Sequence, residues 1–241
     1  MIVLLTDFGL GEYVGVMKGV ILGIDAEARI VDLCHTIGPQ SLVEASWVLK
    51  NNCTYFPKGA IFCCVVDPGV GSARRAIVVK TDDNIFVAPD NGLLWETLRE
   101  QNILSIRELA VPADASRTFH GRDVFARAAA RANLGQFDEL GEEIESIERF
   151  ELYRNGREGI VVRIDRFGNI VTNLPPLEKN DHAVTIGEHT YDLRHWPTYD
   201  EAPDGELFLI TGSCGTLEIS LNNGNANELL DLSAGQRITI A

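Results

Sequence analysis

The hydrophobic pattern of this chain changes near residue 150, and that change limits its fold more than any other feature. Before it, short apolar runs typical of buried strands alternate with segments of helical spacing. After it, short β-rich runs are separated by Gly, Asn, Asp and Pro, with little sign of helix. Two patterns of this kind indicate two domains. We place them at residues 1–150 and 157–241, joined by an acidic segment that we interpret as a solvated linker.

The order of elements in the first half predicts an α/β domain with a mostly parallel sheet. The run Ile61–Val66 is apolar throughout, as expected of a strand buried on both faces. The stretch Thr81–Asn84 predicts a tight hairpin turn. We expect further strands at Ile2–Leu5, Arg29–Leu33, Ala76–Lys80 and Ile85–Ala88, and helices at Tyr13–Ile24, Leu42–Leu49, Leu93–Leu98 and Val124–Ala130.

Ligands of such sheets bind outside the carboxyl ends of the strands. Two predicted strand ends carry polar residues and glycines, at positions 7–9 (Asp-Phe-Gly) and 67–71 (Asp-Pro-Gly-Val-Gly). Taken alone, each is as well explained by a turn whose aspartate caps backbone amides. The Gly-x-Gly element is a weak phosphate signal, because the full G-x-G-x-x-G pattern is absent.

The second half predicts a small all-β domain, a barrel or a sandwich. Its expected strands are Gly159–Ile164, Ile170–Thr172, Ala183–Ile186, Leu207–Thr211, Thr216–Leu221 and Gln236–Ile240. Polar clusters lie between them, at residues 165–169, 213–215 and 222–224. Singly, each of these clusters is typical of a turn.

Composition excludes several classes of partner. The formal net charge is −14, and no basic patch for nucleic acid or a membrane surface is visible. No apolar run approaches the roughly 20 residues of a spanning helix, and the short apolar start lacks the basic flank of a signal peptide. The five cysteines form no C-x-x-C pair, which favours a reducing cytoplasm. The five histidines show no metal-ligand spacing, so we expect no metal site.

Together, the polar motifs are more specific than any one of them. In chain order they are Leu5–Gly9, Val66–Gly71, Ala88–Leu94, Thr118–Asp123, Asp165–Asn169 and Thr172–Asn173. This series resembles the S-adenosylmethionine (SAM) hydroxide adenosyltransferases, or SAM hydrolases, which are related to the SAM-dependent fluorinase and chlorinase. The resemblance covers essentially the whole chain. It implies a Rossmann-like N-terminal domain, a C-terminal β-barrel, and a homotrimer that binds SAM where domains of neighbouring subunits meet.

The resemblance also implies roles for individual residues. The Asp-Arg-His set that marks the hydroxide-using branch corresponds to Asp67, Arg74 and His120, with Arg75 adjacent to the chosen arginine. Asp7 corresponds to the residue that holds the ribose hydroxyls, with Phe8 beside it.

In the second half, the resemblance assigns the methionine ammonium to Asp165 and Ser213. It assigns adenine to Phe167, Asn169 and the backbone near Leu221–Asn223, so that Asn223 is included among the binding residues.

Three differences from the halogenases favour water over halide as the nucleophile. The halogenases have Tyr where Asp67 stands, and the fluorinase has Ser at the Gly121 position and a long insertion near Thr81–Asn84. Two further departures concern binding contacts: Gln40 replaces an aromatic residue near the ribose, and Cys214 replaces an arginine.

The function implied is displacement at C5′ of SAM by water, which yields adenosine and L-methionine with no cofactor. Arg74 is a permanent cation that can stabilise hydroxide, and His120 and Asp67 can orient water or move its proton. Two alternatives stay open at this point. One is a chloride-using SAM halogenase, and the other is a SAM or adenosine sensor without catalysis.

Overall fold

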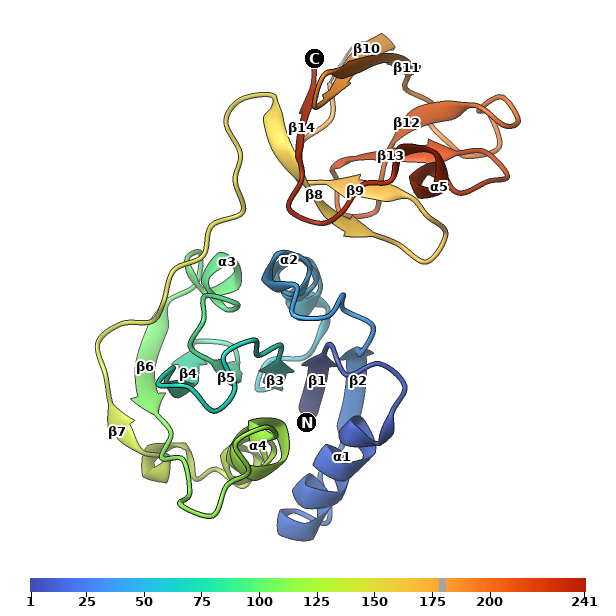
Figure 1. Cartoon of the computed structure of the whole chain (residues 1–241). Coiled ribbons are helices and arrows are strands. Elements are labelled where there is room, and N and C mark those ends of the chain that lie inside the picture. The colour runs from blue at the N-terminus through green and yellow to red at the C-terminus, as the bar shows by residue number, and fades with distance from the viewer. Residues whose placement is uncertain (178–180) are drawn as a thin grey trace. The chain divides into compact units, whose positions relative to one another are not determined.

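The computed structural model describes residues 1–177 and 181–241, and the chain divides into two compact units, Met1–Glu151 and Leu152–Ala241. Figure 1 follows the chain from the N-terminal unit, drawn in blue to green, into the C-terminal unit, drawn in orange and red.

Residues 1–151, all of which the structure describes, contain a seven-stranded sheet of order β2-β1-β3-β5-β4-β6-β7. The strands β2, β1, β3 and β5 pair in parallel, whereas β4, β6 and β7 pair antiparallel with their neighbours. The sheet is therefore mixed and mostly parallel. Its strands are β1 (Ile2–Thr6), β2 (Ile30–Cys34), β3 (Ile61–Val65), β4 (Ala76–Thr81), β5 (Ile85–Pro89), β6 (Ile103–Glu108) and β7 (Glu142–Glu143).

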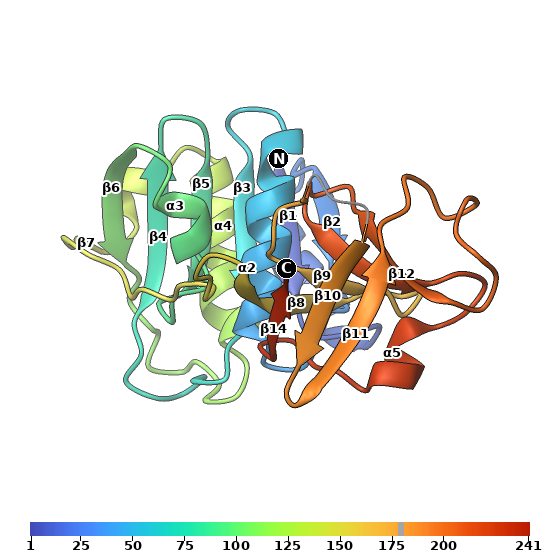
Figure 2. The ribbon, with the colours of Figure 1, turned by 90° about the horizontal axis from the view of Figure 1, so that it is seen from above.

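Helices cover both faces of this sheet (Figures 1 and 2). On one face, α1 (Glu12–Ile24) packs against α4 (Ala126–Asn133); on the other, α2 (Leu42–Asn52) packs against α3 (Trp95–Leu98). The alternating side chains of β3 enter two separate cores, Cys63 on the α1 and α4 side and Cys64 on the α2 and α3 side. The sequence prediction of a strand buried on both faces is confirmed. Shorter helical turns are η1 (Cys53–Tyr55), η2 (Gly121–Phe125) and η3 (Phe137–Glu139).

The connections around β1 create the ligand-binding edge expected of such a sheet. Helix α1 leads from β1 to β2 along one face, and α2 returns from β2 to β3 along the opposite face. Strands β1 and β3 are neighbours, with Thr6 opposite Val65. Their carboxyl ends therefore flank a point where the chain connections diverge, which is where open α/β sheets bind ligands.

The described part of Leu152–Ala241 contains a second seven-stranded sheet, of order β11-β10-β14-β8-β9-β13-β12, in which every paired strand is antiparallel. A bridge between His195 and Leu209 brings the two ends of this order together, so the sheet is a nearly closed barrel. Its elements are β8 (Glu158–Ile164), β9 (Ile170–Thr172), β10 (Asp181–Ile186), β11 (His189–Arg194), β12 (Leu207–Thr211), β13 (Leu217–Leu221), β14 (Arg237–Ile240) and the helix α5 (Ala226–Leu230).

Two longer strands lack the pattern that sequence reasoning needs. In β11 only Leu193 is buried, and in β6 only Ile106 is buried, so neither shows a clear alternation of apolar and polar residues. The hairpin of β10 and β11 is visible in Figure 2, where the two strands lie side by side. The predicted hairpin of β4 and β5 is confirmed by their antiparallel pairing.

Candidate functional site

A buried cluster of Asp67, Arg74 and His120 lies just beyond the carboxyl end of β3. Arg74 Nε donates to Asp67 Oδ1 at 2.9 Å and to Oδ2 at 3.1 Å, and Arg74 Nη2 also pairs with Oδ2. The same Nη2 lies 2.8 Å from His120 Nδ1. The side chains of Arg74 and Asp67 are only 9% and 6% exposed, and His120 is 5% exposed, so the cluster is largely shielded from bulk water.

The loop between β3 and β4 is folded so that Arg74 points back toward Asp67. Ser72 Oγ donates to the Gly69 carbonyl at 2.7 Å, and the Arg74 amide donates to Ser72 Oγ at 3.2 Å. Gly71 has a φ of +76°, and a Cβ there would lie 2.3 Å from the Arg117 carbonyl oxygen. Only glycine fits that conformation and that contact, which ties this loop to the segment preceding His120.

The hydrogen bond to Arg74 determines the protonation state of His120. A guanidinium carries donors and no acceptor, so His120 Nδ1 must be the unprotonated, accepting nitrogen. The ring is therefore neutral, with its proton on Nε2. Burial and the charge of Arg74 both lower the pKa of His120, against a smaller opposite effect of Asp67 and Asp123. The group that His120 offers to a ligand is thus an Nε2–H donor.

The neighbouring Arg75 is engaged elsewhere. Its Nε donates to Asp90 Oδ2 at 2.8 Å, and its Nη2 donates to the Ser146 carbonyl at 3.1 Å. The Asp90 carboxylate is buried and also accepts the Glu148 amide at 2.7 Å. Of the two adjacent arginines, Arg74 is the one that the structure brings to Asp67 and His120.

Asp7 and Phe8 lie in the loop after β1, on the neighbouring strand end. Asp7 Oδ2 accepts the backbone amide of Gln40 at 2.8 Å. The Phe8 ring packs against Phe119, with ring centroids 5.8 Å apart. This contact connects the Asp7 loop to the residue that precedes His120.

Gly121 fills the space beneath this aromatic contact. A Cβ at Gly121 would lie 3.1 Å from the Phe119 ring and 3.3 Å from both Phe8 and the Met17 sulfur. A larger residue here would need one of these neighbours to shift. The η2 turn that begins at Gly121 is π-helical, a geometry often found at functional sites.

The five binding residues assigned to the second half of the chain line one cavity of about 690 Å³ in the C-terminal unit. They are Asp165, Phe167, Asn169, Ser213 and Asn223. Phe167 is 73% exposed, which is unusual for a large aromatic side chain and leaves its ring available to stack on a ligand. The residues come from the loop after β8, the loop after β12 and the end of β13, three segments far apart in sequence.

Asp165 organises the first of these segments. Its Oδ1 accepts the amides of Phe167 and Asn169 at 2.8 and 2.9 Å, and its Oδ2 accepts Asn169 Nδ2 at 2.9 Å. Asn223 has a φ of +55°, and its side chain donates to Asp204 Oδ1 at 2.8 Å.

Sequence reasoning missed two polar residues of this cavity, Tyr199 and Glu218. Tyr199 lies outside the regular strands, where no motif marks it. Glu218 lies within β13, where a single carboxylate among apolar neighbours gave no motif. The only sequence signal for Glu218 is its inward position in a strand whose other residues are mainly apolar.

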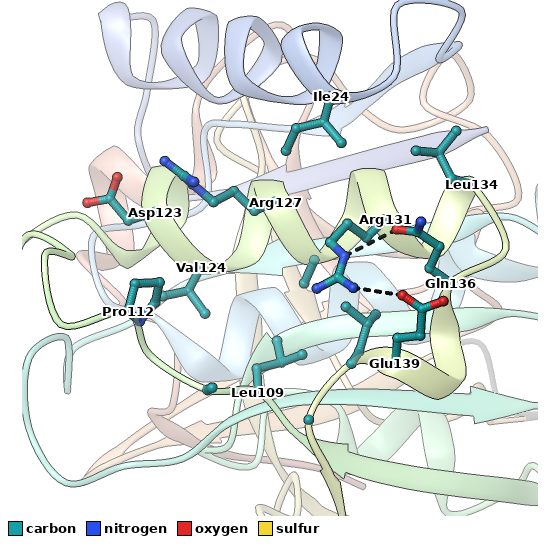
Figure 3. Close-up of a pocket in the computed structure, with 14 residues that line it drawn as sticks. Ile24, Leu109, Pro112, Asp123, Val124, Arg127, Arg131, Leu134, Gln136 and Glu139 are labelled. Atoms are coloured by element: carbon teal, nitrogen blue, oxygen red, sulfur yellow. Dashed lines mark hydrogen bonds and ion pairs between the residues drawn. The ribbon is translucent and has the colours of Figure 1, made fainter.

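Another cavity, of about 590 Å³, lies beside α4 in the N-terminal unit (Figure 3). None of the site residues named from sequence lines it. Arg131 bonds across it to Gln136 Oε1 at 3.2 Å and to Glu139 Oε2 at 3.1 Å, and Asp123 accepts the Ser116 amide. These polar groups satisfy one another, so this cavity is a weaker candidate than the Asp67 cluster.

Two further searches cover the described residues only. Residues 1–177 and 181–241 hold no group of three or more His, Cys, Asp or Glu side chains arranged to bind a metal ion. In the same residues, no helix has the length and apolar character needed to cross a membrane.

Comparison with known proteins identifies relatives over the full length of the chain. A family model for the SAM hydroxide adenosyltransferase N-terminal domain matches residues 2–141, and one for the C-terminal domain of the same family matches residues 159–239. The chain is 38% identical to the (R)-S-adenosyl-L-methionine hydrolase of Thermus thermophilus, with 98% of this chain and 97% of the relative covered.

Two other comparisons set the range of the similarity. The solved structure of an uncharacterized conserved protein from Thermotoga maritima has a TM-score of 0.92 and 36% identity, with both chains covered completely. A fluorinase of Nocardia brasiliensis is 23% identical over all of this chain and 96% of its own length. The hydrolase is therefore nearer in sequence than the halogenase.

Proposed function

The chain belongs to the SAM hydroxide adenosyltransferase family, and from this we propose that it hydrolyses SAM to adenosine and L-methionine. The observation that carries the proposal is the buried Asp67–Arg74–His120 cluster at the carboxyl edge of the sheet. Its members are the groups that activation of a water molecule requires. The substrate is itself the activated species, so the proposed reaction uses no cofactor.

In the proposed reaction, the oxygen of water attacks C5′ while the C5′–sulfur bond breaks and its electron pair stays on the sulfur of methionine. The leaving group is a neutral thioether and needs no acid. The difficulty is the nucleophile, because free water has a pKa of about 15.7.

Each residue of the cluster has a distinct part in activating water. Arg74 cannot lose its proton and stabilises negative charge that develops on the attacking oxygen. His120 donates its Nε2–H to that oxygen and orients it. Asp67 Oδ1 accepts only Arg74 Nε, so it retains acceptor capacity for the proton that the water loses.

The low exposure of the cluster favours this chemistry. Attack of a developing anion on a sulfonium neutralises charge, and bulk water would stabilise the separated charges more than the transition state. Alignment of oxygen, C5′ and sulfur adds a positional contribution, for which effective molarities set an upper range of about 7–11 kcal/mol.

The function is tested by incubating the protein with SAM in oxygen-18 water and identifying the nucleoside by mass spectrometry. We expect adenosine labelled at the 5′-hydroxyl, together with L-methionine. Both sulfonium epimers are assayed, since the Thermus relative is named for the (R) form. Unlabelled adenosine would refute direct displacement, chloroadenosine formed with added chloride would identify a halogenase, and binding without any product would identify a sensor.

The neutral state of His120 predicts how activity depends on pH. Burial and Arg74 place its pKa below the ordinary value of 6.5, and protonation would turn Nδ1 from an acceptor into a donor facing Arg74. We therefore expect kcat/KM to fall on the acid side with an apparent pKa below 6.5. NMR titration of the His120 ring provides the assignment. An acid limb clearly above 6.5 would contradict the neutral ring.

The same shift affects stability. The unfolded chain binds a proton at His120 at higher pH than the folded chain, so this residue's contribution is fully present above about pH 6.5 and is lost as pH falls through its folded-state pKa. Thermal denaturation at several pH values measures this effect.

We extend the proposal to a homotrimer in which SAM lies between the N-terminal unit of one subunit and the C-terminal unit of its neighbour. The family resemblance motivates this arrangement. Two observations support it: the Asp67 cluster and the 690 Å³ cavity belong to different units, and Leu10, beside the Asp7 loop, is 97% exposed. The five free cysteines favour a cytoplasmic location for the enzyme.

A further inference from the structure

Glu218 is a buried carboxylate that lines the cavity of the C-terminal unit. It is 8% exposed and lies on β13, opposite the apolar residues Ile210 and Val171 of the adjoining strands. The hydrogen bond recorded for its carboxylate is a long one, with Tyr199 Oη 3.5 Å from Oε2. A buried carboxylate with so little compensation is costly unless a ligand supplies donors.

The chain leaves room for this carboxylate in a specific way. Gly212 lies beside it, and a Cβ at that position would be 1.7 Å from Glu218 Oε1 and 2.3 Å from its carboxyl carbon. Glu218 therefore occupies the space that a side chain at position 212 would fill. Ser213, which the family resemblance assigns to the methionine ammonium, is the next residue and lines the same cavity.

Asp165, the other carboxylate assigned to the ammonium, has most of its acceptor capacity in use. It receives two backbone amides and the Asn169 side chain, which together hold the loop in place. A carboxylate has about four lone-pair sites, so little capacity is left for a ligand with three N–H donors. Glu218, by contrast, has acceptor sites to spare.

The charges around Glu218 favour a cationic partner. Burial and the nearby Asp165 raise its pKa, and the Tyr199 hydroxyl lowers it by a smaller amount. Cys214, on the loop between β12 and β13, is a further titratable neighbour, and Arg163 of β8 acts on that thiol. Two carboxylates close together in one cavity are stabilised when a cation is placed between them.

We propose that Glu218 binds the primary ammonium of the amino-acid part of the substrate, sharing it with Asp165. This inference rests on the proposed function. The ammonium is preferred over the sulfonium because only the ammonium carries N–H donors for a carboxylate to accept. Ammonium binding stabilises the ionised form of Glu218, so binding is accompanied by proton release wherever the free protein holds Glu218 protonated.

The test compares two ligands that differ in the amino-acid part and lack the sulfonium charge. S-adenosylhomocysteine carries the ammonium, whereas 5′-methylthioadenosine does not. We expect Glu218→Gln to weaken S-adenosylhomocysteine binding about 10- to 100-fold, as measured by calorimetry, and to change 5′-methylthioadenosine binding less than about twofold. Glu188→Gln, which removes an exposed carboxylate of the same unit, is the matched control and should alter neither.

The pH dependence provides an independent readout. The wild-type affinity for S-adenosylhomocysteine should rise with pH through the titration of Glu218, and Glu218→Gln should lack that rise. If this variant folds poorly, Glu218→Asp, which keeps the charge but withdraws it by one methylene, should lose affinity for S-adenosylhomocysteine selectively.

The outcomes separate this inference from the proposed function. Equal losses for both ligands would overturn it and place Glu218 against the adenosine part or in a structural role. No loss for either ligand would also overturn it. These are binding measurements, so they are independent of whether the wild-type protein turns over SAM, which the isotope experiment decides.

Discussion

Replacing Arg74 with alanine is expected to lower kcat for SAM hydrolysis by about 100- to 1000-fold, the range seen when one preorganised charge-stabilising donor is removed. Arg74 connects Asp67 to His120, so its loss removes the cation and the hydrogen bond that keeps His120 Nδ1 an acceptor. We expect KM to change far less than kcat, because the arginine acts on the nucleophile. Steady-state kinetics with quantified adenosine measures both.

Two further arginine variants make this result interpretable. Arg74→Ala also leaves the buried Asp67 without its partner, which costs about 3–5 kcal/mol for a buried pair, so folding is checked by thermal denaturation. Arg74→Lys keeps a charge but lacks the planar set of donors, and we expect it to fold and still lose most activity. Arg127→Ala, at an exposed arginine of α4, is the control. Unchanged turnover in Arg74→Lys would remove the cation geometry from the mechanism.

The same variant tests whether the site is shared between subunits. Arg74→Ala impairs the N-terminal unit, and Asn169→Ala removes a cavity residue of the C-terminal unit. Each alone should be nearly inactive. Subunits of the two kinds, mixed and reassembled, should recover part of the activity if each site takes one unit from each subunit. No recovery from demonstrably mixed oligomers would refute the shared site.

Replacing Gly71 with alanine is expected to have the second large effect, lowering the free energy of unfolding by about 2–4 kcal/mol. The added Cβ would lie 2.3 Å from the Arg117 carbonyl oxygen, and the backbone there has a φ of +76°. Backbone atoms cannot move aside as the end of a side chain can. The strain would also separate the loop that carries Arg74 from the segment that carries His120, so activity should fall with stability. Chemical denaturation and kinetics measure the two effects.

Gly23→Ala is the matched control, with the opposite expected sign. Gly23 lies in α1, and a Cβ there would meet nothing within 4 Å. Alanine in a helix is favoured over glycine by up to about 1 kcal/mol, so this variant should be as stable as the wild type or more stable. Comparable destabilisation by the two substitutions would show that the tight contact at Gly71 is not the cause.

Much of this architecture could be predicted from sequence because strongly patterned strands report their own environment. Ile61–Val66 is apolar at every position since both of its faces pack against helices. The edge strand β6 and the hairpin strand β11 could not be found in this way, because a strand with one buried residue has no period to detect. The aspartates at the ends of β1 and β3 were visible because a polar residue after an apolar run marks a strand end.

By itself, the sequence determined the change from an α/β to an all-β unit and the motifs that carry the family resemblance, because strand and turn patterns are local properties of the chain. Only the tertiary structure decided between Arg74 and Arg75, by directing one to Asp67 and His120 and the other to Asp90. It also decided the tautomer of His120 and the place of Glu218 in the cavity. These depend on contacts between residues distant in sequence, and no local pattern encodes which donor meets which acceptor.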